Sequence, residues 1–430
     1  MKKTDDGKIG LLAVVSIGVG GMVGGGIFAV LGLAVELAHG GTPAAFMMAG
    51  VVALLTTYSY AKLSVTYPSR GGTVVFLDRV FGAGMFTGSL NLLLWLSYVV
   101  MLSLYAVAFG SYGATFLSPG LQVIGKHVLI SLSVILIAGL NLLSAELIGK
   151  AEDWIVLLKV AILLTFIGVG LAGVDATRIA LDTWSPPLQL VAGGMIIFLA
   201  YEGFELIANT AGDVRDAKRT LPRAYYIAVG FVIVLYVLVS IVTVGNLPVD
   251  TIVAARDYAL AEAARPFLGP AGFTLIAIAA MLSTASAINA TLYGSARLSY
   301  SIARDGELPV ILERKVWNQP VAGLVITTVL TLLVANLLDL SSIATVGSAG
   351  FLLIFAAVNI ANTLSASRTD SRGWISLAGA GACIGALGAL VWQTARTAPP
   401  RLWVLAVLVG LAVIIEGGFR LVKREIRLRE

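Results

Sequence analysis

Long apolar runs make up most of the sequence, and their length constrains the fold more than any other feature. A helix that crosses a lipid bilayer needs about 20 predominantly apolar residues. Of the 430 residues, 58% are hydrophobic and 12% are charged, whereas an average soluble domain has about 25% charged residues. The composition therefore predicts an all-α integral membrane protein embedded in a lipid bilayer. Twelve runs are candidate spans: residues 9–37, 42–66, 84–117, 126–145, 154–174, 189–211, 224–246, 271–302, 320–337, 342–363, 375–395 and 402–422.

The lysines and arginines are distributed unequally between the connections of these runs. With residues 1–8 in the cytoplasm, 22 of the 29 basic residues fall in cytoplasmic segments and 6 fall on the opposite side. Such a bias identifies the cytoplasmic loops of a membrane protein. We therefore expect a plasma membrane protein with both termini and residues 212–223 in the cytoplasm and residues 250–266 outside. The same distribution accounts for the net charge of +5 without a nucleic acid partner.

Two of the twelve runs contain residues that interrupt a helix. The first includes GVGGMVGGGIFAVLG (Gly18–Gly32), with seven glycines in fifteen residues, and glycine costs about 1 kcal/mol relative to alanine inside a helix. The sixth includes AYEGFE (Ala200–Glu205), where two glutamates flank Gly203. Interrupted spans at matching places in two halves are typical of inverted-repeat transporters with a site near the membrane midplane.

The two interruptions divide the chain into blocks of five spans, because each lies in the first span of its block. Residues 9–174 are expected to form the first block and residues 189–363 the second. An odd number of spans per block inverts the second block in the membrane. Residues 375–422 would add two peripheral spans, and residues 1–430 would form a single transporter domain.

An interrupted helix exposes backbone N–H and C=O groups that lipid cannot satisfy. The helix that resumes at Ile27 directs its amides and the positive end of its dipole into the first break, which favours a carboxylate. The carbonyls that end the preceding half favour an ammonium group or another cation. One break therefore offers partners for both charges of an amino acid.

Glycines in this pattern also occur in close helix packing and in nucleotide-binding motifs. Small residues allow membrane helices to approach each other closely, and packing alone would account for the glycines without a ligand. A dinucleotide-binding pattern matches only in a permissive form, at Gly24, Gly26 and Ala29, and it lacks the preceding strand that such a motif requires.

Few residues of the sequence could support other chemistry. Cys383 is the single cysteine, which excludes a disulfide within the chain, and His39 and His127 are far apart in the sequence. The sequence contains no histidine–cysteine metal cluster and no catalytic cluster, so we expect no metal, no cofactor and no enzymatic activity. A channel would need a continuous polar path, and a sensor would usually need an output domain.

Four segments resemble the signatures of one transporter superfamily. They are GGMVGGGIFAVLG (20–32), PSRGGTVVFLDRVFG (68–82), FLAYEGFELIANTAGDVRDAKRTLPRA (198–224) and STASAINATLYGSARLSYSIARDGELP (283–309). In this order they resemble the amino acid–polyamine–organocation superfamily. The resemblance implies a LeuT-like fold of two inverted five-helix repeats, with spans one and six broken and two further helices. It also implies secondary transport of amino acids or related amines.

The resemblance assigns substrate contacts to both breaks. The substrate carboxylate would meet the backbone amides of Gly24, Gly25 and Gly26. The substrate ammonium would meet backbone carbonyls at Met22, Phe198, Leu199 and Glu202. Leu199 lies where the family often has an aromatic residue, and Glu202 lies where it often has a neutral one. The preferred substrate side chain therefore stays open.

The resemblance extends to ion coupling. A subset of proton-coupled members has a lysine in span five at the place of a sodium ion, and Lys159 matches this position. Its ammonium would lie among polar groups of spans one and eight: the carbonyls near Gly20 and Val23, and the hydroxyl of Ser283 or Thr284. The alternative is that the long side chain of Lys159 extends back to the cytoplasmic interface.

Glu202 and Glu205 lie inside a span, where ionisable residues are costly and usually functional. Glu202 is expected either to contact a cationic substrate side chain or to pair with a neighbouring polar group. Glu205 is a weaker candidate for a proton-sensitive or gating contact. Sodium coupling, exchange, and the transport of polyamines or other organic amines are alternatives to proton-coupled uptake of amino acids. A disulfide-linked heavy chain is not expected, because residues 111–127 contain no cysteine.

Overall fold

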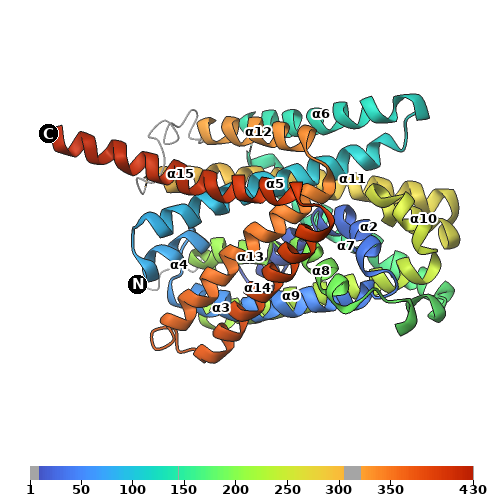
Figure 1. The fold of residues 1–430 in the computed structure, drawn as a ribbon, viewed down its shortest axis with the longest axis horizontal. Coiled ribbons are helices and arrows are strands. Elements are labelled where there is room, and N and C mark those ends of the chain that lie inside the picture. The colour runs from blue at the N-terminus through green and yellow to red at the C-terminus, as the bar shows by residue number, and fades with distance from the viewer. Residues whose placement is uncertain (1–8, 144, 305–320, 430) are drawn as a thin grey trace, which may run out of the picture.

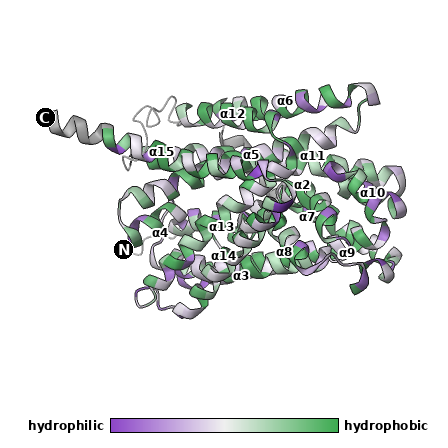
Figure 2. Ribbon diagram, in the orientation of Figure 1, coloured by the Kyte–Doolittle hydropathy of each residue, from purple (hydrophilic) through white to green (hydrophobic). Residues whose placement is uncertain are grey.

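A computed structural model describes residues 9–143, 145–304 and 321–429 (Figure 1). Within these residues the regular elements are helices, and β-structure is limited to two isolated bridges, Ile9 with Val214 and His39 with Trp184. The bundle consists of long helices, and the C-terminal helix extends past its end. Figure 2 shows hydrophobic residues along most of the helix length, with hydrophilic residues mainly near the helix ends.

The helices that carry the predicted spans are α1 (Leu11–Met22) with α2 (Gly26–Ala38), α3 (Thr42–Thr66), α5 (Met85–Ala114), α6 (Gln122–Leu143), α7 (Ala145–Gly170), α8 (Pro187–Ile196) with the 3₁₀ segments η5 (Ile197–Tyr201) and η6 (Phe204–Asp213), α9 (Ala217–Asn246), α11 (Ala259–Arg304), α12 (Val321–Leu337), α13 (Leu340–Leu364), α14 (Gly373–Thr397) and α15 (Pro400–Arg429). Shorter elements connect them: α4 (Gly72–Phe81), α10 (Val249–Ala254), η1 (Pro119–Leu121), η2 (Leu171–Gly173), η3 (Ala176–Ile179), η4 (Leu181–Thr183) and η7 (Arg256–Tyr258).

The predicted all-α membrane architecture is confirmed. In the described part of the chain, ten helical segments are long and apolar enough to cross a membrane, and α1 with α2 forms an eleventh as a bent pair. The ninth predicted run corresponds to α12, which is shorter at 17 residues. The spans differ in how much of their surface other helices cover: 94% of the most apolar stretch of α5 is buried inside the bundle, but only 11% of that of α15. Helix α5 is therefore central and α15 peripheral.

Both predicted interruptions occur at the expected residues. Helix α1 ends at Met22, and α2 begins at Gly26 with its axis turned by 46°. In span six, α8 passes into η5 and the chain breaks at Glu202–Gly203. The continuation after this break, η6, is a 3₁₀ helix over its whole length, which the apolar pattern of the sequence does not distinguish from an α-helix.

Gly203 explains why the second break needs a glycine. Its φ of +117° lies in the left-handed region, which costs glycine no steric energy. A Cβ atom at Gly203 would also lie 2.4 Å from the carbonyl carbon of Gly21. The backbones of the two breaks are therefore in direct contact, although Gly21 and Gly203 belong to different halves of the sequence.

Two faces of the bundle are distinguished by the segments that lie there. The N-terminal face carries Ile9, whose backbone N–H donates to Asp213 (3.0 Å) and whose carbonyl accepts from Arg215 (3.0 Å). The opposite face carries the end of α2, α10 and η7, which are contiguous in the bundle. The positions of basic residues predict that the N-terminal face is cytoplasmic.

Cysteine labelling tests this orientation. Cys383 is buried, so we expect the thiol reagent to label this native cysteine little, and labelling then reports the introduced cysteine. Leu181→Cys on the opposite face should react with a membrane-impermeant thiol reagent added to intact cells, and Arg219→Cys on the N-terminal face should react only after the cells are opened. Both native side chains are exposed, at 77% for Leu181 and 80% for Arg219. Labelling of both from outside would contradict the orientation.

Candidate functional site

The first break presents free amides. The N–H of Gly24 donates to the Gly21 carbonyl (3.2 Å), whereas within the described residues the N–H groups of Gly25 and Gly26 donate no hydrogen bond. This is expected of the first turn of a helix such as α2. The structure therefore leaves two of the three predicted carboxylate-binding amides available and uses that of Gly24 locally.

The walls of this break are close to the glycine backbone. A Cβ atom at Gly25 would lie 2.3 Å from a ring carbon of Tyr105, and one at Gly26 would lie 2.8 Å from the Cα atom of Ala200. Tyr105 belongs to α5, and Ala200 belongs to the second break. Glycine is therefore required at both positions, because a side chain would push α5 or span six away.

Two of the predicted ammonium acceptors, the carbonyls of Met22 and Leu199, already have partners inside the protein. The hydroxyl of Tyr236, on α9, donates to the Met22 carbonyl (2.7 Å) and also reaches the Ala200 carbonyl (3.2 Å). The Leu199 carbonyl accepts the N–H of Glu202 (3.2 Å). A carbonyl has two lone pairs, so these groups retain capacity for a substrate ammonium.

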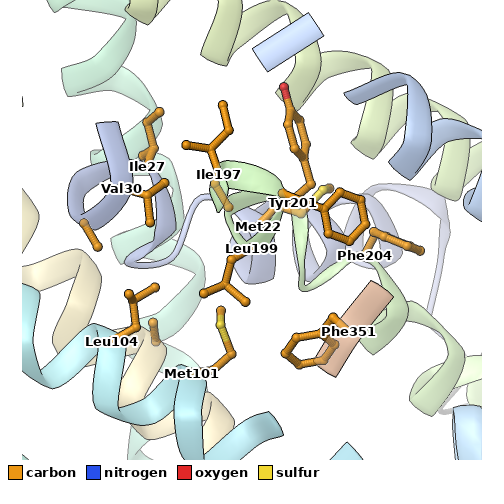
Figure 3. Packing of buried hydrophobic residues seen from close by; sticks show 14 of the residues in the cluster. Met22, Ile27, Val30, Met101, Leu104, Ile197, Leu199, Tyr201, Phe204 and Phe351 are labelled. Carbon is orange, nitrogen blue, oxygen red and sulfur yellow. The ribbon is translucent and has the colours of Figure 1, made fainter. Parts of the chain in front are cut away.

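Hydrophobic side chains surround the breaks. Phe198 and Leu199 are fully buried, and Leu199 lies in the cluster that Figure 3 shows around the two breaks. A Cβ atom at Gly347 would lie 3.0 Å from both methyl groups of Leu199, so this side chain points towards α13. The surroundings of the predicted substrate are therefore apolar beside Leu199.

Lys159 reaches the first break from α7. Its Nζ donates to the Gly20 carbonyl at 2.9 Å, and the residue is only 3% exposed. The side chain of Lys159 therefore does not extend back to the cytoplasmic interface, which was the alternative that the sequence left open. The cation of Lys159 lies instead against the last turn of α1.

Of the two hydroxyls predicted as alternatives beside Lys159, the structure brings that of Ser283 to the break. Ser283 Oγ donates to the Val23 carbonyl (3.0 Å) and also contacts the Gly24 carbonyl. Thr284 Oγ1 bonds instead to the Ala280 carbonyl of its own helix at 2.7 Å, and its methyl group faces Gly25. Thr284 is thus a wall of the break and donates no hydrogen bond to it.

Glu202 and Glu205 form a buried pair at the second break. They are 4% and 1% exposed, so both carboxyl groups are shielded from water. Glu205 also accepts the Gly203 N–H (2.7 Å) and the Tyr98 hydroxyl (3.3 Å), and Glu202 accepts the Tyr105 hydroxyl (3.5 Å). None of the ion pairs between described residues includes either glutamate.

A pocket leads from the N-terminal face towards this pair. Its volume is 660 Å³, and it is lined by Ile9, by Arg70 and Gly71, and by residues of η6 and α11. A cavity of 30 Å³ shares Leu206 and Asn209 with this pocket and is also lined by Tyr98, whose hydroxyl contacts Glu205. Polar groups therefore extend from the N-terminal face to the second break.

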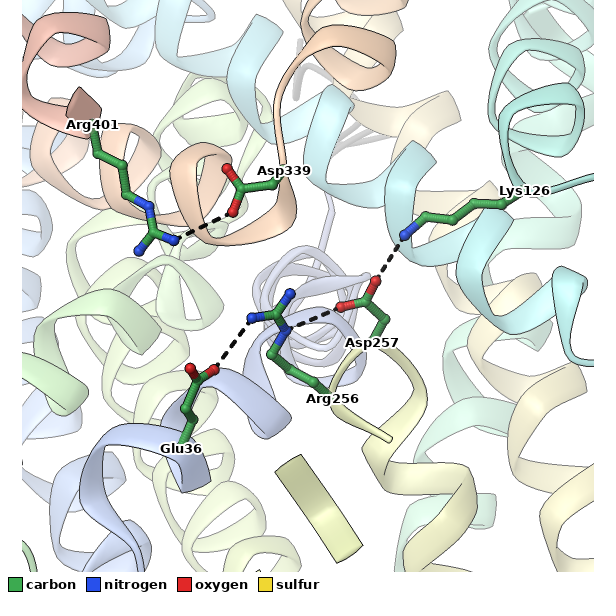
Figure 4. A network of polar contacts seen from close by, with 6 residues as sticks. All are labelled: Glu36, Lys126, Arg256, Asp257, Asp339 and Arg401. Atoms are coloured by element: carbon green, nitrogen blue, oxygen red, sulfur yellow. Dashed lines mark hydrogen bonds and ion pairs between the residues drawn. The ribbon is translucent and has the colours of Figure 1, made fainter. Parts of the chain in front are cut away.

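Ion pairs join the elements of the opposite face. Arg256 of η7 pairs with Glu36 at the end of α2 (3.4 Å) and with Asp257 (3.4 Å), and Asp257 pairs with Lys126 of α6 (2.7 Å), as Figure 4 shows. A Cβ atom at Gly32 would lie 2.2 Å from the Arg256 carbonyl oxygen. Turn η7 is therefore packed directly on α2.

Sequence reasoning missed the tyrosines of the site: Tyr98, Tyr105 and Tyr236. A buried tyrosine hydroxyl usually finds a hydrogen-bond partner, so a tyrosine inside an apolar span signals a polar group nearby. The sequence does not say which helix supplies that group. The partners, two glutamates and the carbonyls of both breaks, are 36 to 214 residues away in the chain.

Comparison with known proteins identifies the family. The family model described as amino acid permease matches residues 9–415. The chain belongs to the amino acid permease family. This permease is 36% identical over 366 residues to an uncharacterized protein of Methanocaldococcus jannaschii, covering 85% of this chain and 84% of that protein.

Two further relatives are transporters by name. The permease is 37% identical over 351 residues to the inner membrane transport protein YbaT of Escherichia coli, covering 81% of this chain and 82% of that protein. It is 26% identical over 370 residues to the methylthioribose transporter of Bacillus subtilis, covering 80% and 78% of the two chains. The permease is therefore a multi-pass membrane transporter of the amino acid–polyamine–organocation superfamily, and not an enzyme.

A substitution in the first break tests whether it binds substrate. Gly26→Val should abolish binding of the transported amino acid, because the side chain would occupy the space between the α2 amides and Ala200. Gly168→Val is the matched control, since Gly168 lies in α7 with no atom within 4 Å of its Cβ position. Binding to purified protein should survive in the control only. Unchanged binding by Gly26→Val would mean that the glycines serve helix packing alone.

Proposed function

We propose that the permease is a proton-coupled symporter that takes up amino acids across the plasma membrane by alternating access. Residues 9–174 and 189–363 form its two inverted repeats, and residues 375–422 are additional helices. The N-terminal face is cytoplasmic, with both termini on that side. The hydrogen bond between Lys159 and the Gly20 carbonyl carries this proposal, because it ties a titratable cation to the half-helix that ends at the substrate site.

The amino acid is bound through its backbone charges. Its carboxylate accepts hydrogen bonds from the amides of Gly25 and Gly26 at the N-terminus of α2, where the helix dipole also favours an anion. Its ammonium is bound by carbonyls of the breaks, including those of Met22, Phe198, Leu199 and Glu202. Support comes from the contact between the breaks, which brings amides and carbonyls to one place.

Lys159 replaces a sodium ion in this proposal. When charged, it binds the Gly20 carbonyl and holds α1 against α7, while Ser283 holds Val23 against α11. Burial disfavours the charged form of a lysine, so its proton can leave during the transport cycle. The neutral amine binds the carbonyl less strongly, and α1 is then free to move. The proton thus biases an equilibrium between two states of one element.

The two faces of the permease are assigned to the two sides of the membrane. The 660 Å³ pocket on the N-terminal face is the route between the site and the cytoplasm. The ion pairs of Glu36, Arg256, Asp257 and Lys126 close the opposite face. In this assignment the structure represents a state that is closed to the outside.

Sodium-coupled transport and amino acid exchange are the main alternatives, and an organic amine is the alternative cargo. The methylthioribose transporter shows that one relative is named for a substrate that is not an amino acid. Uptake of labelled amino acids and amines into proteoliposomes, with proton and sodium gradients imposed separately, distinguishes these cases.

The variant Lys159→Ala tests the coupling step. It should lose accumulation driven by a proton gradient and retain exchange of substrate at equal concentrations, because the substrate contacts lie on other residues. Lys62→Ala is the matched control, since Lys62 also donates to a backbone carbonyl, that of Asp370, but on the surface of the bundle. Undiminished proton-driven accumulation by Lys159→Ala, or strict sodium dependence of the wild type, would overturn the mechanism.

The variant Glu202→Gln tests the acidic pair. Its amide keeps the size of the carboxyl group and can still accept the Tyr105 hydroxyl, so the fold should persist while the ionisable group is removed. We expect an altered ranking among neutral and cationic amino acids or a shifted pH profile of uptake. Glu416→Gln is the control, because Glu416 is equally buried but pairs with Arg420 in the peripheral α15. If ranking and pH profile both match the wild type, Glu202 has only a structural role.

A further inference from the structure

A second pocket lies on the face opposite the N-terminal face. Its volume is 310 Å³, and its walls are the end of α5, the start of α6, η7 and the first part of α11. None of its lining residues belongs to either break. The pocket is therefore separate from the site assigned to the transported amino acid.

A buried hydroxyl faces this pocket without a partner. Ser111 is 4% exposed and lines the pocket, and its Oγ makes no hydrogen bond within the described residues. Buried polar groups are nearly always hydrogen-bonded. The Ser111 hydroxyl can therefore donate a hydrogen bond to a polar group in the pocket or accept one from it.

The charged residues of the pocket provide both signs. Lys126 pairs with Asp257 at 2.7 Å, and Arg265 pairs with Glu262 at 2.8 Å. The side chains of Lys126 and Asp257 are 28% and 24% exposed, so this pair is largely shielded from water. The guanidinium of Arg265 lies over the Phe273 ring, 4.1 Å from its centre, which adds an apolar wall beside the charges.

We propose that this pocket is a second binding site and that its ligand is a zwitterionic amino acid. A carboxylate can pair with Lys126 or Arg265, and an ammonium can pair with Asp257 or Glu262. A ligand with one charge alone would satisfy one member of an ion pair and leave the opposite charge without its partner, which is costly in a shielded place. A zwitterion satisfies both, and Ser111 supplies a further hydrogen bond.

The ligand would act on the elements that close this face. Asp257 pairs with both Lys126 and Arg256, and Arg256 pairs with Glu36 at the end of α2. A ligand that engages Asp257 therefore changes the ion pairs that hold η7 on α2, the half-helix that begins at the first break. This consequence for transport rests on the proposed function, whereas the binding site itself does not.

Protection of an introduced cysteine tests the site. Gln122 lines the pocket and is exposed, so Gln122→Cys in a Cys383→Ala background should react with a maleimide. The probe is a mixture of the standard L-amino acids without cysteine, and the comparison is a mixture of propionate and propylamine, which carry the two charges on separate molecules. We expect the amino acids to slow labelling several-fold and the comparison mixture to leave it unchanged.

Matched variants separate this site from the first break. Protection should persist with Gly26→Val, vanish with Glu262→Gln, and be absent for Leu121→Cys, which lies beside the pocket but does not line it. Labelling that amino acids do not slow, or that propionate with propylamine slows equally, would overturn the proposal. If protection disappears with Gly26→Val, the protecting amino acid binds at the first break. That result would overturn the second site and leave the proposed function standing.

Discussion

Backbone groups without helical partners, at two breaks inside an apolar bundle, are the constraint on which the structure depends. A polar group left unsatisfied in such surroundings costs several kcal/mol. Three helices contribute to meeting this cost at the first break: α9 through Tyr236, α11 through Ser283 and α7 through Lys159. These side chains bind carbonyls, and the amides of Gly25 and Gly26 are left without partners among the described residues. The asymmetry favours an anionic ligand at the start of α2.

The spans and the breaks could be predicted from the sequence because both depend on local composition. Runs of about 20 apolar residues give membrane helices. The glycine-rich stretch before Ile27 and the residues around Gly203 are where the helices are interrupted. The position of Lys159 near Gly20 followed from resemblance to a family. In contrast, the sequence left open whether Ser283 or Thr284 contacts the break. The structure shows that Ser283 does and that the Thr284 hydroxyl bonds within α11, because the side-chain rotamers that decide this cannot be deduced from the sequence.

The contacts that could not be predicted are those between distant segments. Tyr236 joins the carbonyls of Met22 and Ala200 across 214 and 36 residues, and Arg256 meets Glu36 across 220 residues. Contacts between residues so far apart in the chain cannot be deduced from a single sequence. The carboxyl pair is an intermediate case: its three-residue spacing was visible, but the partners Tyr98 and Tyr105 appear only once α5 is placed beside the second break.

The central claim is that a proton accompanies each amino acid through this site. The most direct measurement is the internal pH of proteoliposomes, in sodium-free buffer, after the transported amino acid is added outside. The account predicts that the interior acidifies as the labelled amino acid enters, with no requirement for sodium. Entry of the amino acid without acidification, or entry only when sodium is present, would contradict it.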